Sequence, residues 1–309
     1  CAMKKVFHLC HSSKEEVLFR NHDDYNWGFN SYALALYKTE SCSLADAHMS
    51  DHRHLISQTD SPEKMMRINR LSYTRHMNTK YGRRGPLGES ECFITELDGL
   101  YRLIAALTYT MRNALHHGIA PTPFAYPHSS ANIIFREELG KHPDAELLSE
   151  RNYHAHVGRN VEIPNDFKMD KSGLFLRENI TAVKQVELLY GTPKSFLYYM
   201  NRPSDDKWLD EQRSESSHSP LITMELIEQG VLLTDPGYFH TNEKGRQNYG
   251  LMSDIDLCEV IDSLVVNQYK SKSVYTLLYS HKQELYHMIR ELYHVNEMKA
   301  RRCLAMDYM

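Results

Sequence analysis

Two histidines separated by one residue, His52 and His54, lie in the stretch AHMSDHRHLI at residues 47–56. In a β-strand, side chains at positions i and i+2 point to the same face, so the two imidazoles can converge on one metal ion while Arg53 faces the other way. The alternative is a chance polar face, since the chain contains 18 histidines. The hypothesis of a metal site therefore depends on whether other residues supply the remaining ligands.

A helical pattern at residues 100–116 offers one such ligand. Its apolar stripe consists of Leu100, Leu103, Ile104, Leu107, Met111 and Leu115. Tyr109 falls almost opposite this stripe, and Asn113 follows it at i+4, so the two are neighbours on the helix surface. Tyr109 is therefore predicted to contact another element or to belong to a site.

These residue types suit phosphoryl chemistry as a set. The Asn113 oxygen can complete a shell begun by two imidazoles, and mixed N,O ligation with open positions suits Mg²⁺ or Mn²⁺ that also binds a phosphate. A tyrosine hydroxyl is a poor nucleophile without assistance, and a metal that holds the scissile phosphate would assist Tyr109. The resulting phosphotyrosyl ester keeps the energy of the phosphodiester, so strands could be rejoined without a nucleotide cofactor. The absence of a Gly-rich phosphate loop agrees with this.

A basic run without a single acid covers residues 64–84, in a chain whose net charge is −4. A solvated helix face would explain it, but interleaved tyrosines and asparagines favour a nucleic-acid backbone with bases to stack upon. The basic residues expected to bind DNA are Lys64, Arg67, Arg70, Arg75, Lys80, Arg83 and Arg84.

Composition describes an ordinary globular protein of 309 residues, 41% hydrophobic and 25% charged. No apolar run approaches a membrane span, and no signal peptide is visible, so no membrane partner is expected. The six cysteines are scattered without a CxxC pair and are expected to be free thiols in a reducing, cytoplasmic setting.

The elements that must position the site alternate between strand and helix. Strands are expected at 3–10, 43–49, 52–57 and 91–96, and helices at 23–38, 62–80 and 98–117. Ser61 and Pro62 mark one helix start, and Gly82 its end. This order predicts an α+β catalytic domain at 1–140, a sheet with helices on one face. A mixed extension at 141–220 follows, whose polar run 201–219 is predicted to be a linker or mobile loop.

The remaining residues, 221–309, are predicted to form a mainly helical domain. Two short helices at 283–293 and 296–306 form a helix-turn-helix candidate with a basic end at Lys299, Arg301 and Arg302. A small helical cap on the fold is the equal alternative.

Four segments together resemble the single-tyrosine HUH transposases, most closely the REP-associated tyrosine transposases. They are VFHL to FRN at 6–21, AHMSDHRHLI at 47–56, SYTR to NTKYGRRGPL at 72–87, and LTYTMRNALHHG at 107–118. Their order and spacing agree with the family over roughly the first 135 residues.

The resemblance implies a ferredoxin-like catalytic domain that binds single-stranded or hairpin DNA, as a monomer or a homodimer. It implies a divalent metal on His52 and His54 with Asn113 as third ligand. Tyr109 would attack a DNA phosphate and form a 5′-phosphotyrosyl link that permits strand transfer.

Two departures from the family keep alternatives open. Arg53 stands where a hydrophobic residue is usual, and Ala114 where the family has proline. A non-cleaving DNA-binding protein of the same fold is the first alternative. An unrelated metal-dependent hydrolase is the second, and it requires an extra carboxylate near the histidines. Asp51 is the obvious candidate, but strand alternation predicts that it points away from His52.

Overall fold

The first hundred residues of the computed structural model form a four-stranded antiparallel sheet with two helices. The model describes residues 4–141, 145–202, 206–231 and 252–306. The element order is β1 (Val6–Ser12), α1 (His22–Lys38), β2 (Cys42–His48), β3 (His52–Gln58), α2 (Pro62–Tyr81) and β4 (Phe93–Leu97). The strand order β2-β3-β1-β4 is that of a ferredoxin-like βαββαβ unit, which confirms the predicted α+β class.

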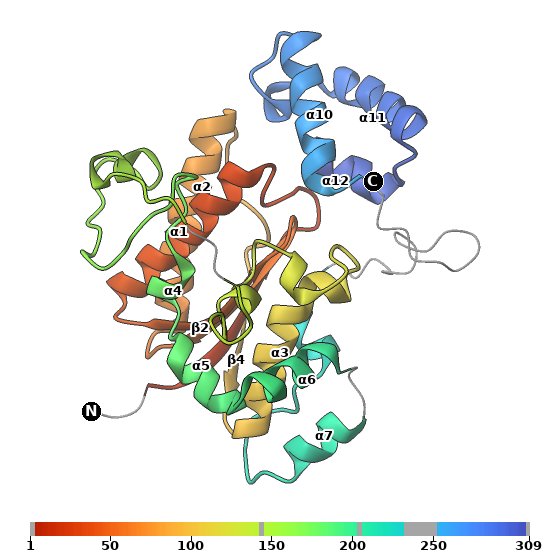
Figure 1. The fold of residues 1–309 in the computed structure, drawn as a ribbon. Coiled ribbons are helices and arrows are strands. Elements are labelled where there is room, and N and C mark those ends of the chain that lie inside the picture. The colour runs from red at the N-terminus through yellow and green to blue at the C-terminus, as the bar shows by residue number, and fades with distance from the viewer. Residues whose placement is uncertain (1–3, 142–144, 203–205, 232–251, 307–309) are drawn as a thin grey trace.

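Helices cover both faces of this sheet (Figure 1). Leu55 of β3 packs with residues of α1 and α2, including Phe29 and Met65. The next residue, Ile56, packs instead with α3 (Leu100–His116), through Leu107 among others. Because neighbouring residues of a strand point to opposite faces, α3 lies on the face opposite to α1 and α2. The α1 and α2 helices share one face of the sheet, as predicted, but α3 was expected on that face as well and covers the other one.

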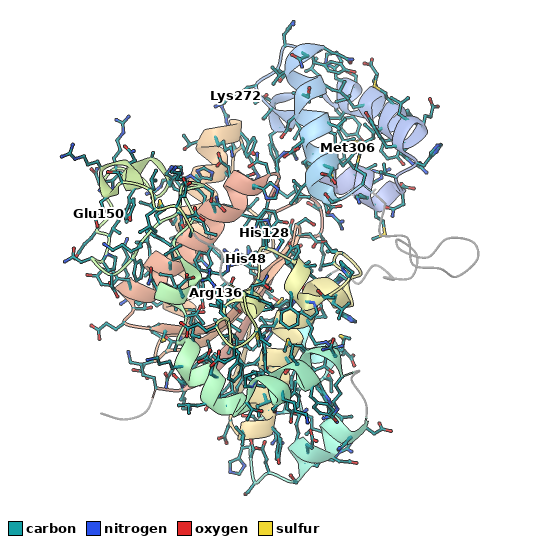
Figure 2. All side chains as sticks on the ribbon, viewed as in Figure 1. His48, His128, Arg136, Glu150, Lys272 and Met306 are labelled. Carbon is teal, nitrogen blue, oxygen red and sulfur yellow. The ribbon has the colours of Figure 1, made fainter. Side chains whose placement is uncertain are left out.

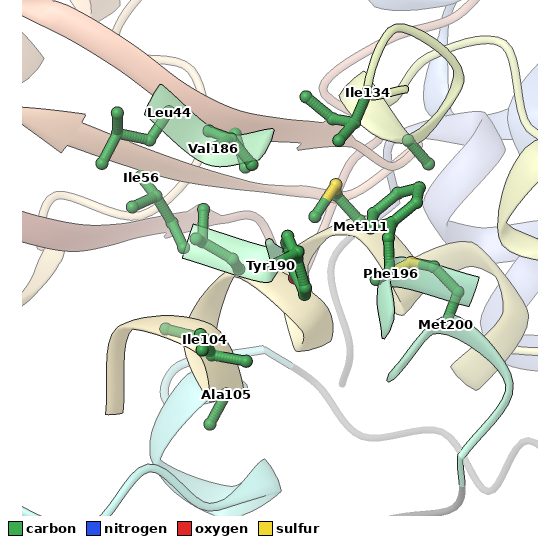
Figure 3. Packing of buried hydrophobic residues seen from close by; sticks show 14 of the residues in the cluster. Leu44, Ile56, Ile104, Ala105, Met111, Ile134, Val186, Tyr190, Phe196 and Met200 are labelled. Carbon is green, nitrogen blue, oxygen red and sulfur yellow. The ribbon is translucent and has the colours of Figure 1, made fainter. Parts of the chain in front are cut away.

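Short helices that follow the sheet bury α3 from further sides. They include α5 (Val183–Tyr190) and α6 (Pro193–Asn201), whose Tyr190 and Phe196 pack against the same core as Met111 (Figure 3). The predicted stripe on α3 is therefore only part of its buried surface, and its first residue, Leu100, is 48% exposed. The other short elements are η1 (Pro123–Ala125), η2 (Ser130–Asn132), η3 (Glu150–Ala155) and α4 (Arg177–Ile180).

The polar run predicted as a linker is partly helical. Within it lies α7 (Asp206–Arg213), followed by α8 (Met224–Ile227). Trp208 is only 4% exposed and anchors α7 to the α3 layer, while most of the helix's other side chains face solvent. Gln212, which is fully buried, exchanges hydrogen bonds with the backbone of Ile222 and adds a second anchor. Two buried side chains thus hold a segment whose average hydropathy indicates a loop.

The C-terminal helices form a group apart from the sheet (Figure 1), and their hydrophobic cluster also takes in Val17 from the segment before α1. They are α10 (Asp254–Asn267), α11 (Tyr279–Tyr293) and α12 (Glu297–Leu304), with the short η4 (Val274–Thr276) between the first two. Arg20, fully buried before α1, binds Asp262 of α10 at 2.7 Å. This ion pair attaches the C-terminal helices to the sheet.

The basic end of the helix-turn-helix candidate is occupied by contacts within the chain. Lys299 lies 3.5 Å from Asp254, and Arg302 donates to Asp254 and Asp51. Arg301 pairs with Glu297 on its own helix. These contacts support the helical-cap alternative for α11 and α12.

The boundaries of α2 follow the residues predicted to set them. Pro62 is its first residue, and Gly82 follows its last in the left-handed conformation, φ 67°. Ser61 occupies the N-cap position, but its side chain makes no capping hydrogen bond.

None of the helices in the described part of the chain is long and apolar enough to span a membrane. The five described cysteines are all free thiols.

Gly28→Ala is expected to destabilise the fold. A Cβ at Gly28 of α1 would lie 2.4 Å from Cε1 of Phe19, a fully buried ring stacked on Tyr25 and held against Tyr73. Overpacking costs about 1–3 kcal/mol, whereas alanine gains about 1 kcal/mol over glycine within a helix. Urea unfolding should therefore show a net loss of about 1 kcal/mol. A stability equal to or above that of the original chain would contradict this.

Candidate metal centre

The two histidines of β3 face the α3 side of the sheet. His52 and His54 are 2% and 0% exposed, and their ring centroids lie 5.1 Å apart. They share this face with Ile56, as the strand period requires.

Each histidine uses its Nδ1 atom on an outer partner. His52 Nδ1 lies 2.8 Å from Asp51 Oδ1, and His54 Nδ1 lies 3.1 Å from His8 Nε2 of β1. A histidine that binds metal through Nε2 typically donates its Nδ1–H to such a partner, which fixes the tautomer. Both rings can therefore offer Nε2 to one point.

The prediction that Asp51 points away from His52 is wrong. Asp51 lies in the turn between β2 and β3, so the alternation of strand side chains does not apply to it. Its carboxylate instead contacts the first histidine of the pair. Burial alone would raise the pKa of Asp51, but Arg302 and His52 hold it below its usual range.

Two oxygen-bearing side chains meet the inward nitrogens. Asn113 Oδ1 of α3 lies 2.9 Å from His52 Nε2, as the sequence predicted for a third ligand position. Glu228, directly after α8, was not predicted. Its Oε1 lies 2.7 Å from Asn113 Nδ2 and 3.5 Å from His54 Nε2, and its side chain is 1% exposed.

The donor set fits a metal ion. One ligand atom each from His52, His54 and Glu228 lies within 4.8 Å of the others. Ligands about 2.1 Å from an ion are about 3.0 Å apart in octahedral geometry and about 3.4 Å apart in tetrahedral geometry. The observed distances are similar: 2.9 Å from His52 Nε2 to Asn113 Oδ1, and 3.5 Å from His54 Nε2 to Glu228 Oε1. His54 Nε2 is buried without a hydrogen-bond partner among the described residues. A buried imidazole nitrogen without a hydrogen bond, beside a carboxylate, is a suitable ligand for a cation.

His117 adds a third imidazole to the edge of this group. Its Nε2 lies 3.2 Å from Glu228 Oε2, and its ring centroid lies 4.8 Å from that of His52. His117 follows Asn113 by four residues, so helical spacing could have indicated it.

The buried titratable groups of the centre shift one another's pKa values. Burial alone would raise the pKa of Glu228, but His117 and His54 hold it far below its usual range. Burial lowers the pKa of His54 in spite of the nearby Glu228. For His52, burial opposes the charged form, yet Asp51 raises its pKa overall. Since metal binding needs neutral imidazoles, the raised pKa of His52 means that a cation competes with a proton for this ring.

Tyr109 lies one helical turn before Asn113 and is half-buried. Its ring meets Trp208 edge to face at 5.2 Å. The segment 206–231 follows this side of α3, with Glu215 on Arg102 at 3.2 Å and Glu228 on Asn113. The surface predicted to hold the nucleophile is thus lined by residues from much later in the chain.

The predicted DNA-binding residues divide into two groups. Lys64, Arg67, Arg75 and Arg84 are exposed. The others contact the chain itself: Arg70 donates to the Glu89 and Ser90 carbonyls, Lys80 binds Asp24 and Arg83 binds Glu16. Because α2 packs on the face opposite to α3, its basic residues and the His pair lie on different sides of the sheet.

Arg53 finds neither the acid nor the solvent that a buried charge ordinarily requires. It is 1% exposed on the α2 side of the sheet. It donates to Asn69 Oδ1 at 3.1 Å and approaches His11 Nδ1 at 3.4 Å, and no carboxylate binds it in the described residues. Burial lowers its pKa to about 10.

His48, in the same sequence stretch as the pair, lies outside the centre. It is buried between the rings of Phe19 and Phe29, and its backbone N–H donates to the carbonyl of His128. Figure 2 labels His48 and His128. Asp46 Oδ2 lies 3.5 Å from its Nε2. Sequence proximity therefore does not make it a ligand.

No protein-family model matches the chain, and none of the curated proteins matches it. Among solved structures, it is similar to a REP-associated tyrosine transposase bound to a REP hairpin. The likeness covers 46% of this chain and 84% of that one, with 12% sequence identity and a TM-score of 0.37. Similarity at this level assigns no family to the chain.

Proposed function

We propose that the protein cleaves and rejoins a DNA strand with Tyr109 as nucleophile at a divalent metal held by His52, His54 and Glu228. The supporting observation is the convergence of two imidazoles, one amide oxygen and one carboxylate, with Tyr109 one turn along the same helix. The proposed substrate is single-stranded or hairpin DNA.

Each residue has a defined part in this reaction. The phenol oxygen of Tyr109 bonds to phosphorus, the bond to the 3′ oxygen breaks, and a 5′-phosphotyrosyl ester and a 3′ hydroxyl result. Asn113 Nδ2 donates to Glu228 and orients that carboxylate, while Asn113 Oδ1 lies beside the metal-binding nitrogen of His52. The metal, when bound, supplies charge stabilisation to the phosphate. Of the two ions predicted, two imidazoles favour Mn²⁺ over Mg²⁺, which prefers oxygen ligands.

The proposal is tested by incubating the full chain with end-labelled hairpin DNA and Mn²⁺. A covalent protein–DNA adduct that survives denaturing electrophoresis, and that disappears when EDTA is added first, is expected. Failure to form an adduct with single-stranded and hairpin substrates, in spite of measurable Mn²⁺ binding, would contradict nucleophilic attack by the protein.

A metal-dependent phosphodiester hydrolase is the second candidate, favoured by one observation. A hydrolase requires a carboxylate beside the histidines, and Glu228 provides it. Here water attacks and Tyr109 has no chemical role. Cleaved DNA without an adduct, at a rate that Tyr109→Phe leaves unchanged, would support the hydrolase.

A further inference from the structure

Arg302 of α12 connects the C-terminal helices to the metal centre. Its Nη1 lies 2.9 Å from Asp51 Oδ2, and its Nη2 lies 2.7 Å from Asp254 Oδ2. The whole residue is 8% exposed. Arg302 therefore bridges the carboxylate of Asp51, in the turn between β2 and β3, and the carboxylate of Asp254, in α10.

The two oxygens of Asp51 have different partners. Oδ2 accepts from Arg302, and Oδ1 faces His52 Nδ1 at 2.8 Å. A carboxylate held at both oxygens cannot rotate, so the plane of Asp51 and the direction of its contact with the imidazole are fixed together. Asp254 is fixed in turn by Ser50 Oγ at 2.6 Å and by Lys299 at 3.5 Å.

We propose that Arg302 is a positioning residue of the metal centre, acting through Asp51 on His52. This inference rests on the metal site of the proposed function. Arg302 keeps Asp51 in place as the acceptor of the Nδ1 proton of His52. The ring is then held in the tautomer whose Nε2 lone pair faces Asn113 and Glu228. The C-terminal helices are, in this view, part of the metal centre.

A purely structural role would give a different result, and the chain offers a matched control. The Arg20–Asp262 pair also joins the C-terminal helices to the sheet, at 2.7 Å, yet neither residue contacts the metal centre. Asp262→Asn weakens the same attachment without touching Asp51. If Arg302 only held the helices in place, Arg302→Gln and Asp262→Asn would have the same effect on metal binding.

The experiment measures Mn²⁺ affinity of the full chain by titration calorimetry, and the visible absorption of bound Co²⁺, well below the unfolding temperature. Arg302→Gln is expected to weaken binding by about 10-fold, the lower end of the usual effect of losing an outer partner of a ligand, because Arg302 acts on His52 through Asp51. Arg302→Lys should recover part of this loss, since one ammonium keeps the charge but cannot bridge two carboxylates as a planar fork does. Asp262→Asn should bind as the original chain does, even where its melting temperature falls.

The measured affinities distinguish a positioning role of Arg302 from a purely structural one. Unchanged affinity in Arg302→Gln, or an equal loss in Asp262→Asn, overturns the positioning role. If Arg302→Gln does not fold, Arg302→Lys decides, and affinity equal to that of the original chain overturns the proposal. No binding of Mn²⁺ or Co²⁺ by the original chain defeats the proposed metal site itself, a failure visible before any variant is made.

Discussion

Glu228→Gln is expected to reduce Mn²⁺ affinity more than about 100-fold, beyond the usual effect of removing an outer partner of a ligand. The substitution keeps the size of the side chain and its contact with Asn113, but it removes the negative charge beside His54 and His117. A neutral amide is a much weaker ligand than a carboxylate for a divalent cation. Titration calorimetry of the full chain gives the affinity directly.

The matched control is Glu225→Gln, which changes an exposed acid on α8, the short helix that ends just before Glu228. It should bind Mn²⁺ as the original chain does. If Glu228→Gln also binds normally while Asn113→Ala does not, the third ligand is Asn113, as the sequence alone predicted. Loss of binding in both variants would support a shared role.

Tyr109→Phe is expected to abolish the covalent protein–DNA adduct completely. The change removes the hydroxyl and keeps the ring, so the edge-to-face contact with Trp208 and the packing of α3 should persist. Affinity for Mn²⁺ should remain unchanged, because Tyr109 is not among the proposed ligands. Denaturing electrophoresis with labelled hairpin DNA measures the adduct, and calorimetry measures the metal.

Tyr101→Phe provides the comparison for this variant. Tyr101 lies on the same helix, is 37% exposed and is not part of the site. It should form the adduct at the original rate. An adduct that persists in Tyr109→Phe, mapped to another tyrosine, would show that the nucleophile was wrongly assigned.

Local periodicity was sufficient for the elements that carry the predicted ligands. The alternation in β3 correctly placed His52 and His54 on one face and Arg53 on the other. Helical spacing placed Asn113 one turn from Tyr109 on α3. Both placements are short-range consequences of backbone geometry, which a single sequence expresses directly. The contact of Asn113 with His52, 61 residues away in the sequence, was expected from donor chemistry and the family resemblance instead.

Long-range contacts could not be predicted in the same way. Glu228 meets Asn113 across 115 residues, and the residues around it form no motif. Asp51 was misjudged because strand geometry was applied to a turn. The sparse apolar residues of 206–213 concealed the role of Trp208, since average hydropathy does not weigh one anchoring side chain against its polar neighbours.

The position of Arg302 has a consequence for the order in which the centre is assembled. At about 5–20 residues per second, a ribosome would make His52 on the order of tens of seconds before Arg302. During that interval the nascent chain contains the two histidines and Asp51 without the guanidinium that fixes them, and for most of it without Glu228. A growing chain therefore holds only part of the ligand set, and the proposed metal centre would reach its full affinity only after α12 has been made.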